Sequence, residues 1–375
     1  MHYRRMPIEV ESPEELGYDK IECNLAESSF ADQRLRDLGM NMNDLLLFYG
    51  DHKGKPELRE LIAAEYNVDP KDVLLTSGAA PALFIVATSL LEKGQEVLVT
   101  KTNYATNIET PRAIGAKVNL LTLRFENKYG IDLEELDKSI TPSTKLVSLT
   151  YPHNPTGVTV DYNALNQIIQ LVEKKSSFLL FDETYRDMHF SSPPPLAASL
   201  SSSVISIGSM SKSYGLPGIR IGWLICTNDQ LMETFLAAKE QIFITNSVVD
   251  EEIAYQYLLN KSKYFPQVKS TITQNFALVK DFMNKQKCLE WVEPSGGCVC
   301  FPRIKKDINV NTESFYDLLL NKYKTYVGRG KWFEEDDRYM RIGFGWEKEE
   351  KLKKGLQNIV KAIEDASGKS SDLLK

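Results

Sequence analysis

The residue with the most distinctive chemistry is Lys212, within the segment VISIGSMSKSYGLPGIRIGWLI at residues 204–225. Apolar runs flank it on both sides, and small serine and glycine residues surround it. Burial disfavours a charged ammonium and lowers a lysine pKa, which frees the amine to attack an aldehyde. A solvated surface lysine in a helix-packing Gly/Ser loop would give a similar pattern. The segment alone leaves both interpretations open.

Two further segments place polar side chains where apolar runs end. SLTYPHNPTGV at residues 148–158 turns at Asn154, and FLLFDETYRDM at residues 178–188 ends its apolar run at Asp182, with Tyr185 three residues later. A buried carboxylate needs a partner, which a protonated heteroaromatic nitrogen would supply. The amide and the phenol could bind an oxygen on the same ring. The alternatives are a β-turn for Asn154 and a helix N-cap for Asp182.

An anion site is predicted in VLLTSGAAPALF, residues 73–84, where small residues separate a strand from a helix. Backbone N–H groups at a helix N-terminus bind phosphate, and Ser209 and Arg220 could add a hydroxyl and a guanidinium. The segment has neither the P-loop pattern nor the G-x-G-x-x-G pattern. Together the segments offer a nucleophilic amine, a pyridinium partner, donors for a ring oxygen and an anion cradle. Pyridoxal phosphate needs that set of groups.

Alternating strands and helices must position these residues. Continuous apolar runs are typical of strands buried on both faces of a parallel sheet. We expect strands at residues 96–100, 117–123, 145–150, 177–182, 203–208 and 222–226, with helices at 163–175 and at 81–94, the second ended by Gly94.

After about residue 245 the pattern changes to long helices, short strands around CVCFPRI and YMRIGFG, and a final helix. We therefore expect an α/β protein with a large domain at residues 47–260. Residues 1–46 and 261–375 would form a smaller α+β domain.

The composition excludes several classes of protein. The 375 residues carry a net charge of −6 without a basic block, which argues against a nucleic-acid partner. The five cysteines form no C-x-x-C pair and the four histidines show no ligand spacing, so we expect buried free thiols, a reducing compartment and no metal. The sequence shows no signal peptide and no membrane span, which predicts a cytoplasmic protein without a membrane partner.

Taken together, these motifs resemble the class I/II aminotransferases, which are fold-type I pyridoxal-phosphate enzymes, over nearly the whole chain. The resemblance implies a mainly parallel, seven-stranded-type sheet between helices, plus a small α+β domain. SMSKSYGLPGIRIGW is similar to the family's Schiff-base signature, so Lys212 would hold pyridoxal 5′-phosphate as an internal aldimine. Lys212, Asp182 and Tyr185 would be the catalytic residues.

The resemblance also implies roles for the other motif residues. Asp182 would bind the pyridine nitrogen, Asn154 and Tyr185 the ring 3′-oxygen, and Tyr104 in KTNYATN would stack on the ring. Arg341 in YMRIGFG would bind the substrate carboxylate, and Asn154 would be a further substrate-binding residue. The phosphate ligands would be Gly78, Ala79, Ala80, Ser209, Arg220 and, from the partner subunit of a homodimer, Tyr49 in YGDHKGKPELRE.

The expected reaction moves an amino group between an α-amino acid and a 2-oxo acid. The same lysine and aspartate would equally serve a C–S or β/γ-eliminating lyase, or an arginine-type oxidase or cyclase. A cofactor-binding regulator is a further alternative, which predicts an added DNA-binding domain or a lost lysine. The resemblance extends to the capreomycidine-synthase-like branch. There Glu27, in IECNLAESSFADQ, would face a cationic side chain; a solvated or helix-capping glutamate is the other interpretation.

Overall fold

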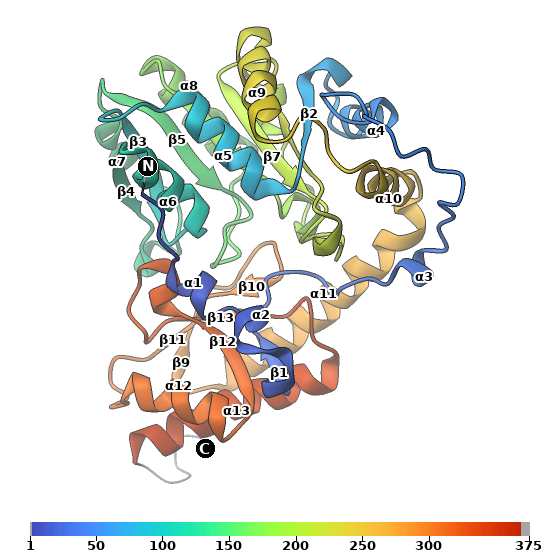
Figure 1. Ribbon diagram of the computed structural model, residues 1–375. Coiled ribbons are helices and arrows are strands. Elements are labelled where there is room, and N and C mark those ends of the chain that lie inside the picture. Colours follow the sequence, from blue (N-terminus) through green and yellow to red (C-terminus); the bar gives the residue numbers. More distant parts are fainter. Residues whose placement is uncertain (1, 369–375) are drawn as a thin grey trace.

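The computed structural model describes residues 2–368 and contains one large and two small sheets (Figure 1). The large sheet has the strand order β2-β8-β7-β6-β5-β3-β4. β8 runs antiparallel to both of its neighbours, and the other pairs are parallel. The strands are β2 (Val73–Thr76), β3 (Glu96–Lys101), β4 (Lys117–Thr122), β5 (Thr144–Thr150), β6 (Phe178–Asp182), β7 (Val204–Ser209) and β8 (Gly222–Ile225). The expected strands and the α/β class are confirmed.

Helices cover both faces of this sheet, which explains why its strands are continuously apolar. Leu74 packs into one hydrophobic cluster, whereas its neighbours Val73 and Leu75 pack into the other. Successive side chains of a strand point to opposite faces, so both faces need apolar residues. One face is covered by α5 (Ala79–Leu90), α6 (Ala105–Ile114) and α9 (Asp229–Ile242), and the other by α4 (Pro56–Tyr66), α7 (Leu133–Ser139), α8 (Tyr162–Lys174) and α10 (Val248–Leu259).

Helix α8 follows the sequence pattern closely, and α5 departs from it. In α8 the Asp161 side chain caps the N-terminus by accepting from the Ala164 N–H, and the predicted apolar face is buried. Helix α5 ends at Leu90, so the prediction that Gly94 ends it was wrong. Leu91 is already extended, and the Gly94 N–H donates to the Gly115 carbonyl, 3.0 Å away. The backbone thus turns toward β3 instead of continuing the helix.

The second sheet joins the beginning of the chain to its last third. Its order is β1-β12-β13-β10, and β1 runs parallel to β12. Its strands are β1 (Cys23–Leu25), β10 (Val299–Cys300), β12 (Thr325–Arg329) and β13 (Met340–Gly343), while β9 (Leu289–Glu290) pairs with β11 (Arg303–Ile304). Around them lie α1 (Pro7–Val10), α2 (Pro13–Leu16), α3 (Leu35–Leu38), α11 (Lys261–Lys285), α12 (Thr312–Asn321) and α13 (Glu349–Ser367).

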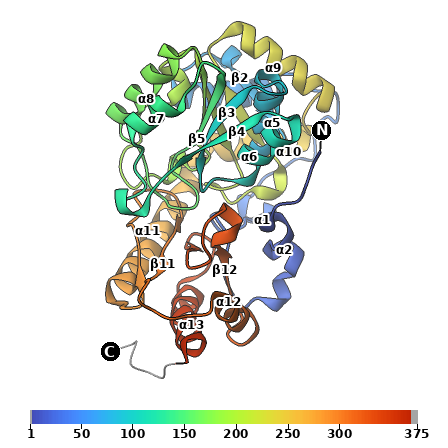
Figure 2. The same cartoon turned by 90° about the vertical axis from the view of Figure 1, so that its left-hand side faces the viewer.

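Figure 2 shows the four-stranded sheet and its helices below the large sheet, with the N-terminal helices alongside. We propose that residues 47–260 form the large domain and that residues 1–46 and 261–375 form the small one, of which residues 1 and 369–375 lie outside the described part of the chain. All five cysteines are buried with free thiols, as expected. Within residues 2–368, no helix is long and apolar enough to cross a membrane, and no cluster of three potential ligands could hold a metal ion.

Candidate active site

Six strands of the large sheet end at the same edge, where a cavity of about 390 Å³ opens. Ligands of α/β proteins bind at the carboxyl ends of parallel strands. The strands β2, β3, β4, β5, β6 and β7 end there, at Thr76, Lys101, Thr122, Thr150, Asp182 and Ser209. The small sheet and the N-terminal segment close the opposite side, through residues such as Glu14, Glu27 and Arg341.

The cavity brings together most of the residues predicted from the sequence. Its lining includes Glu27, Ala79, Ala80, Tyr104, Asn154, Asp182, Tyr185, Ser209, Lys212, Arg220 and Arg341. Gly78 does not line it but lies directly behind Arg220. Tyr49 does not line it either, since its side chain is 81% exposed on the segment before α4. Its predicted role across a subunit interface stays a prediction.

Lys212 follows the end of β7 by three residues and is fixed by the N-terminal segment. The Phe30 N–H donates to the Lys212 carbonyl at 3.0 Å, and the Gln33 N–H donates to the Gly215 carbonyl at 2.9 Å. Burial lowers the pKa of the Lys212 amine, with Glu27 acting in the opposite direction. A lowered pKa keeps more of the amine neutral and nucleophilic near neutral pH.

Asp182 ends β6 with one carboxylate oxygen engaged. Its Oδ1 accepts from the backbone N–H and the hydroxyl of Thr184, at 3.0 and 2.6 Å. Both bonds go to the same oxygen, which leaves Oδ2 available to a ligand. Burial raises the pKa of Asp182, and the Thr184 bonds oppose that rise. A cationic ring nitrogen beside Oδ2 would favour the ionised carboxylate.

The Arg341 Nε is buried and makes no hydrogen bond within residues 2–368, and the buried Tyr185 hydroxyl interacts with the Ser28 side chain without forming a close hydrogen bond. Burial raises the pKa of Tyr185, so the phenol stays protonated and can donate. Arg341 donates through Nη1 to Asn154 Oδ1 at 3.0 Å and through Nη2 to the Ala26 carbonyl at 2.7 Å. Unsatisfied buried donors are unusual, and both residues line a cavity that can hold a ligand.

The anion end of the cavity combines a helix N-terminus with Arg220. The Arg220 guanidinium donates to the Pro217 carbonyl at 2.7 Å and to the Ser211 hydroxyl at 3.3 Å. A Cβ on Gly78 would lie 2.4 Å from Arg220 Nη2, so only glycine permits this approach. The first residues of α5, Ala79 and Ala80, line the same end. A guanidinium, a hydroxyl and helix N–H groups are suitable phosphate ligands.

These donors fit pyridoxal phosphate: an anion cradle at one end, an amine and a carboxylate at the centre, and unpartnered donors opposite. Sequence reasoning missed Thr184, Ser211 and Trp332, as well as the cavity-lining N-terminal residues Ser12 and Glu14. The spacing of Asp182 and Thr184 is a local signal, because Asp side chains often bind the backbone two residues on. Ser12 caps its helix by accepting from the Glu15 N–H, but no local pattern indicates that this helix lies over the cavity.

Comparison with known proteins gives consistent results. The model of the family described as aminotransferase class I and II matches residues 24–359. The chain is 30% identical to capreomycidine synthase of Streptomyces vinaceus, over 86% of this chain and 82% of that protein. It is 26% identical to an aspartate aminotransferase of Pyrococcus horikoshii, over 84% and 83% of the two chains. The crystal structure of a PLP-dependent aminotransferase from Streptococcus suis superposes with a TM-score of 0.89 at 27% identity, covering 98% of this chain and 99% of that one.

Proposed function

The chain belongs to the class I and II aminotransferases, and on this basis we propose that it moves an amino group between an α-amino acid and a 2-oxo acid. Its cofactor is pyridoxal 5′-phosphate. The cofactor supplies an aldehyde carbon that reacts with amines and a ring that withdraws electrons from the substrate's Cα–H bond. Lys212 would hold it through that carbon. The observation that carries the proposal is that Lys212, Asp182 and Arg341 line one cavity.

Each group has a task that follows from its surroundings. Arg341 binds the substrate carboxylate, because its Nε is buried without a partner and its Nη groups are fixed by Asn154 and Ala26. Lys212, once released by the incoming amino acid, removes the α-proton as a neutral amine and returns it later as an ammonium. Its lowered pKa suits both directions.

The remaining residues hold the ring in place. Asp182 would hold the protonated ring nitrogen, while the two bonds from Thr184 prevent the carboxylate from rotating. Asn154 and Tyr185 would hold the ring 3′-oxygen, and Tyr104 would contact the ring. Ser209, Arg220 and the N-terminus of α5, with Gly78 behind it, bind the phosphate.

The test is to mix the holoenzyme with a panel of amino donors, release the cofactor with acid and quantify pyridoxamine phosphate. An aminotransferase accumulates pyridoxamine phosphate in amounts equal to the 2-oxo acid formed. Lys212→Ala should abolish turnover and the absorbance of the lysine-bound cofactor. Retention of that absorbance would refute the role of Lys212.

A second candidate is supported by the similarity to capreomycidine synthase, namely another pyridoxal-phosphate reaction such as cyclisation or elimination. Lys212 and Asp182 would serve these reactions equally well. A lyase releases ammonia and leaves the cofactor in its aldehyde form, and a cyclase releases a cyclic amino acid. Product analysis in the same assay separates all three reactions.

We also propose a homodimer in which Tyr49 reaches the phosphate site of the partner subunit. Support comes from Leu46, Leu47, Phe48 and Tyr49, which are consecutive and between 59% and 81% exposed. Such an exposed apolar run is typical of an interaction surface. A fully active monomer in sedimentation would contradict this proposal. The buried free thiols support a cytoplasmic location.

A further inference from the structure

The loop that carries Lys212 is joined by buried contacts to the segment that carries Asp182. The first contact is made by the Ser213 hydroxyl, which donates to the Thr184 carbonyl at 3.2 Å. The backbone N–H and the hydroxyl of Thr184 in turn donate to Asp182 Oδ1. A single residue, Thr184, therefore links the neighbour of the reactive amine to the carboxylate on which the proposed function depends.

A second contact lies one residue further along the same loop. The Tyr214 hydroxyl donates to Asp187 Oδ2, and the Tyr214 side chain is buried. Burial raises the pKa of the Tyr214 phenol, which therefore remains protonated and can donate. The ring contacts Tyr257 on α10 and Phe265 on α11, with ring centroids 5.5 and 5.7 Å away. The ring thus anchors the loop in the core, and the hydroxyl binds it to the segment that follows β6.

Asp187 is itself held in place by a lysine from another helix. Lys261, the first residue of α11, forms ion pairs with Asp187 at 3.0 Å and with Glu65 on α4 at 2.8 Å. Burial lowers the pKa of Lys261, but the two carboxylates outweigh that effect and raise the pKa overall, so the side chain stays an ammonium. Hydrogen bonds to charged acceptors are stronger than neutral ones. The ion pair therefore gives Tyr214 an acceptor that is both charged and fixed.

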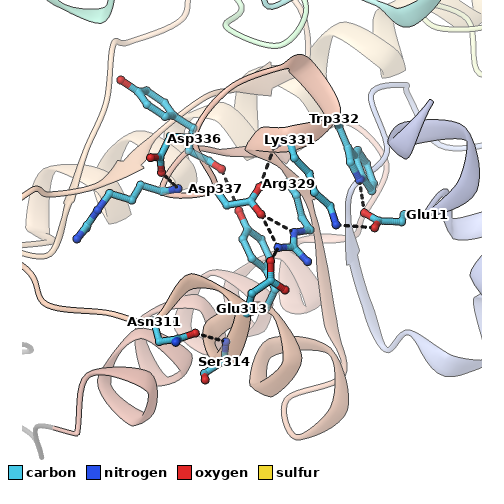
Figure 3. A network of polar contacts seen from close by, with 12 residues as sticks. Glu11, Asn311, Glu313, Ser314, Arg329, Lys331, Trp332, Asp336 and Asp337 are labelled. Carbon is cyan, nitrogen blue, oxygen red and sulfur yellow. Dashed lines mark hydrogen bonds and ion pairs between the residues drawn. The ribbon is translucent and has the colours of Figure 1, made fainter.

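The backbone of the loop is bound to the N-terminal segment instead. The Phe30 N–H donates to the Lys212 carbonyl at 3.0 Å. That segment is attached to the small sheet, because β1 pairs with β12 and because Glu11 accepts from Trp332 Nε1 at 2.8 Å and from Lys331 Nζ at 2.7 Å (Figure 3). The backbone contact thus ties the amine to the small sheet, whereas the side chains of residues 213 and 214 tie it to the end of β6.

We infer that Ser213 and Tyr214 are positioning residues, which set the place of the reactive amine relative to the Asp182 carboxylate. Tyr214 acts through Asp187. The inference rests on the proposed function, in which the amine and the carboxylate act on one rigid cofactor ring, so that their separation has to match it. A misplacement of about 1 Å can lower a rate by about 100-fold.

Tyr214→Phe tests this inference, because it removes the hydroxyl and keeps the ring. Fluorescence titration of the apoenzyme with pyridoxal phosphate should show binding weaker by about 10-fold or more, the size of one hydrogen bond to a charged group. The visible circular dichroism of the bound cofactor should also fall, because that signal requires a fixed position in an asymmetric environment. We expect kcat to fall by a similar factor with the amino-donor KM nearly unchanged, since Arg341 is untouched. Wild-type cofactor affinity and dichroism would overturn the inference.

Tyr264→Phe is the matched control, because it also removes a bonded hydroxyl from the same aromatic cluster. The Tyr264 hydroxyl donates to the Leu38 carbonyl at 2.6 Å, and its ring stacks on Tyr257. Both variants should lower stability in denaturant titration, but the control should keep the wild-type cofactor affinity, dichroism and kcat. Equal losses of these three quantities in the two variants would show that Tyr214 acts through stability alone, which would overturn the inference.

Two further variants test how the contacts act. In an Asp187→Ala background, Tyr214→Phe should cost little further cofactor affinity, and fully additive losses would contradict the action through Asp187. Ser213→Ala removes the other contact and should lower the dichroism as well. Should Tyr214→Phe fail to fold, an unchanged signal in Ser213→Ala refutes the inference. If no amino donor forms pyridoxamine phosphate with the wild-type protein, the proposed function fails, and cofactor titration and dichroism still decide the positioning role.

Discussion

Replacing Gly78 by alanine tests whether the anion end depends on the approach of Arg220. The new Cβ would lie 2.4 Å from Arg220 Nη2 and 3.1 Å from its Cζ. The guanidinium is the flexible end of its side chain, so it should move and take its charge away from the phosphate site. The backbone itself is at φ 98° and ψ 175°, a conformation that costs a residue with a Cβ about 1–3 kcal/mol.

The two effects appear in different measurements. Backbone strain should lower the stability of the cofactor-free protein by about 1–3 kcal/mol, read from denaturant titration. Displacement of Arg220 should remove a charged hydrogen bond worth about 1.5–3 kcal/mol, which weakens cofactor binding by about 10- to 150-fold. Fluorescence titration of the apoenzyme with pyridoxal phosphate measures the second effect.

Gly218→Ala is the matched control, because Gly218 lies two residues from Arg220 and a Cβ there would meet no atom within 4 Å. It should leave cofactor affinity close to the wild-type value. In an Arg220→Ala background, Gly78→Ala should cost little further affinity, since the displaced group is already gone. A Gly78→Ala protein that binds the cofactor as tightly as wild type, or fully additive losses in the double variant, would refute the reasoning.

Three other predictions follow from the same structure. Asp182→Asn keeps an oxygen for Thr184 but loses the charge at the ring nitrogen, so kcat should fall by more than about 100-fold with cofactor still bound; a near-normal rate would exclude this role. Arg341→Lys cannot form the bidentate contact and should raise the amino-donor KM by about 10- to 100-fold, measured in steady-state kinetics. Burial lowers the pKa of Lys239 from 10.5 to about 8, so the unfolded chain holds more protons between these pH values and stability rises with pH across that window. Lys239→Met should flatten this rise in thermal denaturation; an unchanged slope would contradict it.

The cofactor side of the cavity could be predicted because its residues follow strand ends. Each apolar run predicted a strand, and alternation with helices predicted parallel pairing. Parallel strands bring their carboxyl ends to one edge, so Asp182, the turn at Asn154 and the loop at Lys212 had to meet. The direction of β8 could not be predicted in the same way, because a short buried strand is equally apolar in either direction.

Contacts between distant segments were not predictable from local pattern. Arg341 donates to the carbonyl of Ala26, 315 residues earlier, and Trp332 donates to Glu11, 321 residues earlier. Every residue has a backbone carbonyl, so the residue types do not show which carbonyl accepts from Arg341. Glu11 is one of many acidic residues in the chain, so its role could not be identified either. The place of α2 over the cavity depends on these contacts, so the position of its acidic residues relative to the cavity could not be predicted from the sequence.

The cofactor-binding residues could be predicted and the substrate-facing residues could not, and this difference has a chemical cause. A cofactor presents the same nitrogen, oxygen and phosphate in every protein that holds it, so the residues that bind it have restricted types and spacings. A substrate side chain varies, and the cavity walls opposite the large sheet come from the segment after β1, from β13 and from the N-terminal helices. Because β1 pairs with β12, and Glu11 bonds to Trp332 and Lys331, these walls form one unit with the small sheet. Substitutions within that unit should therefore change which amino acid is accepted while leaving the cofactor contacts of the large sheet intact.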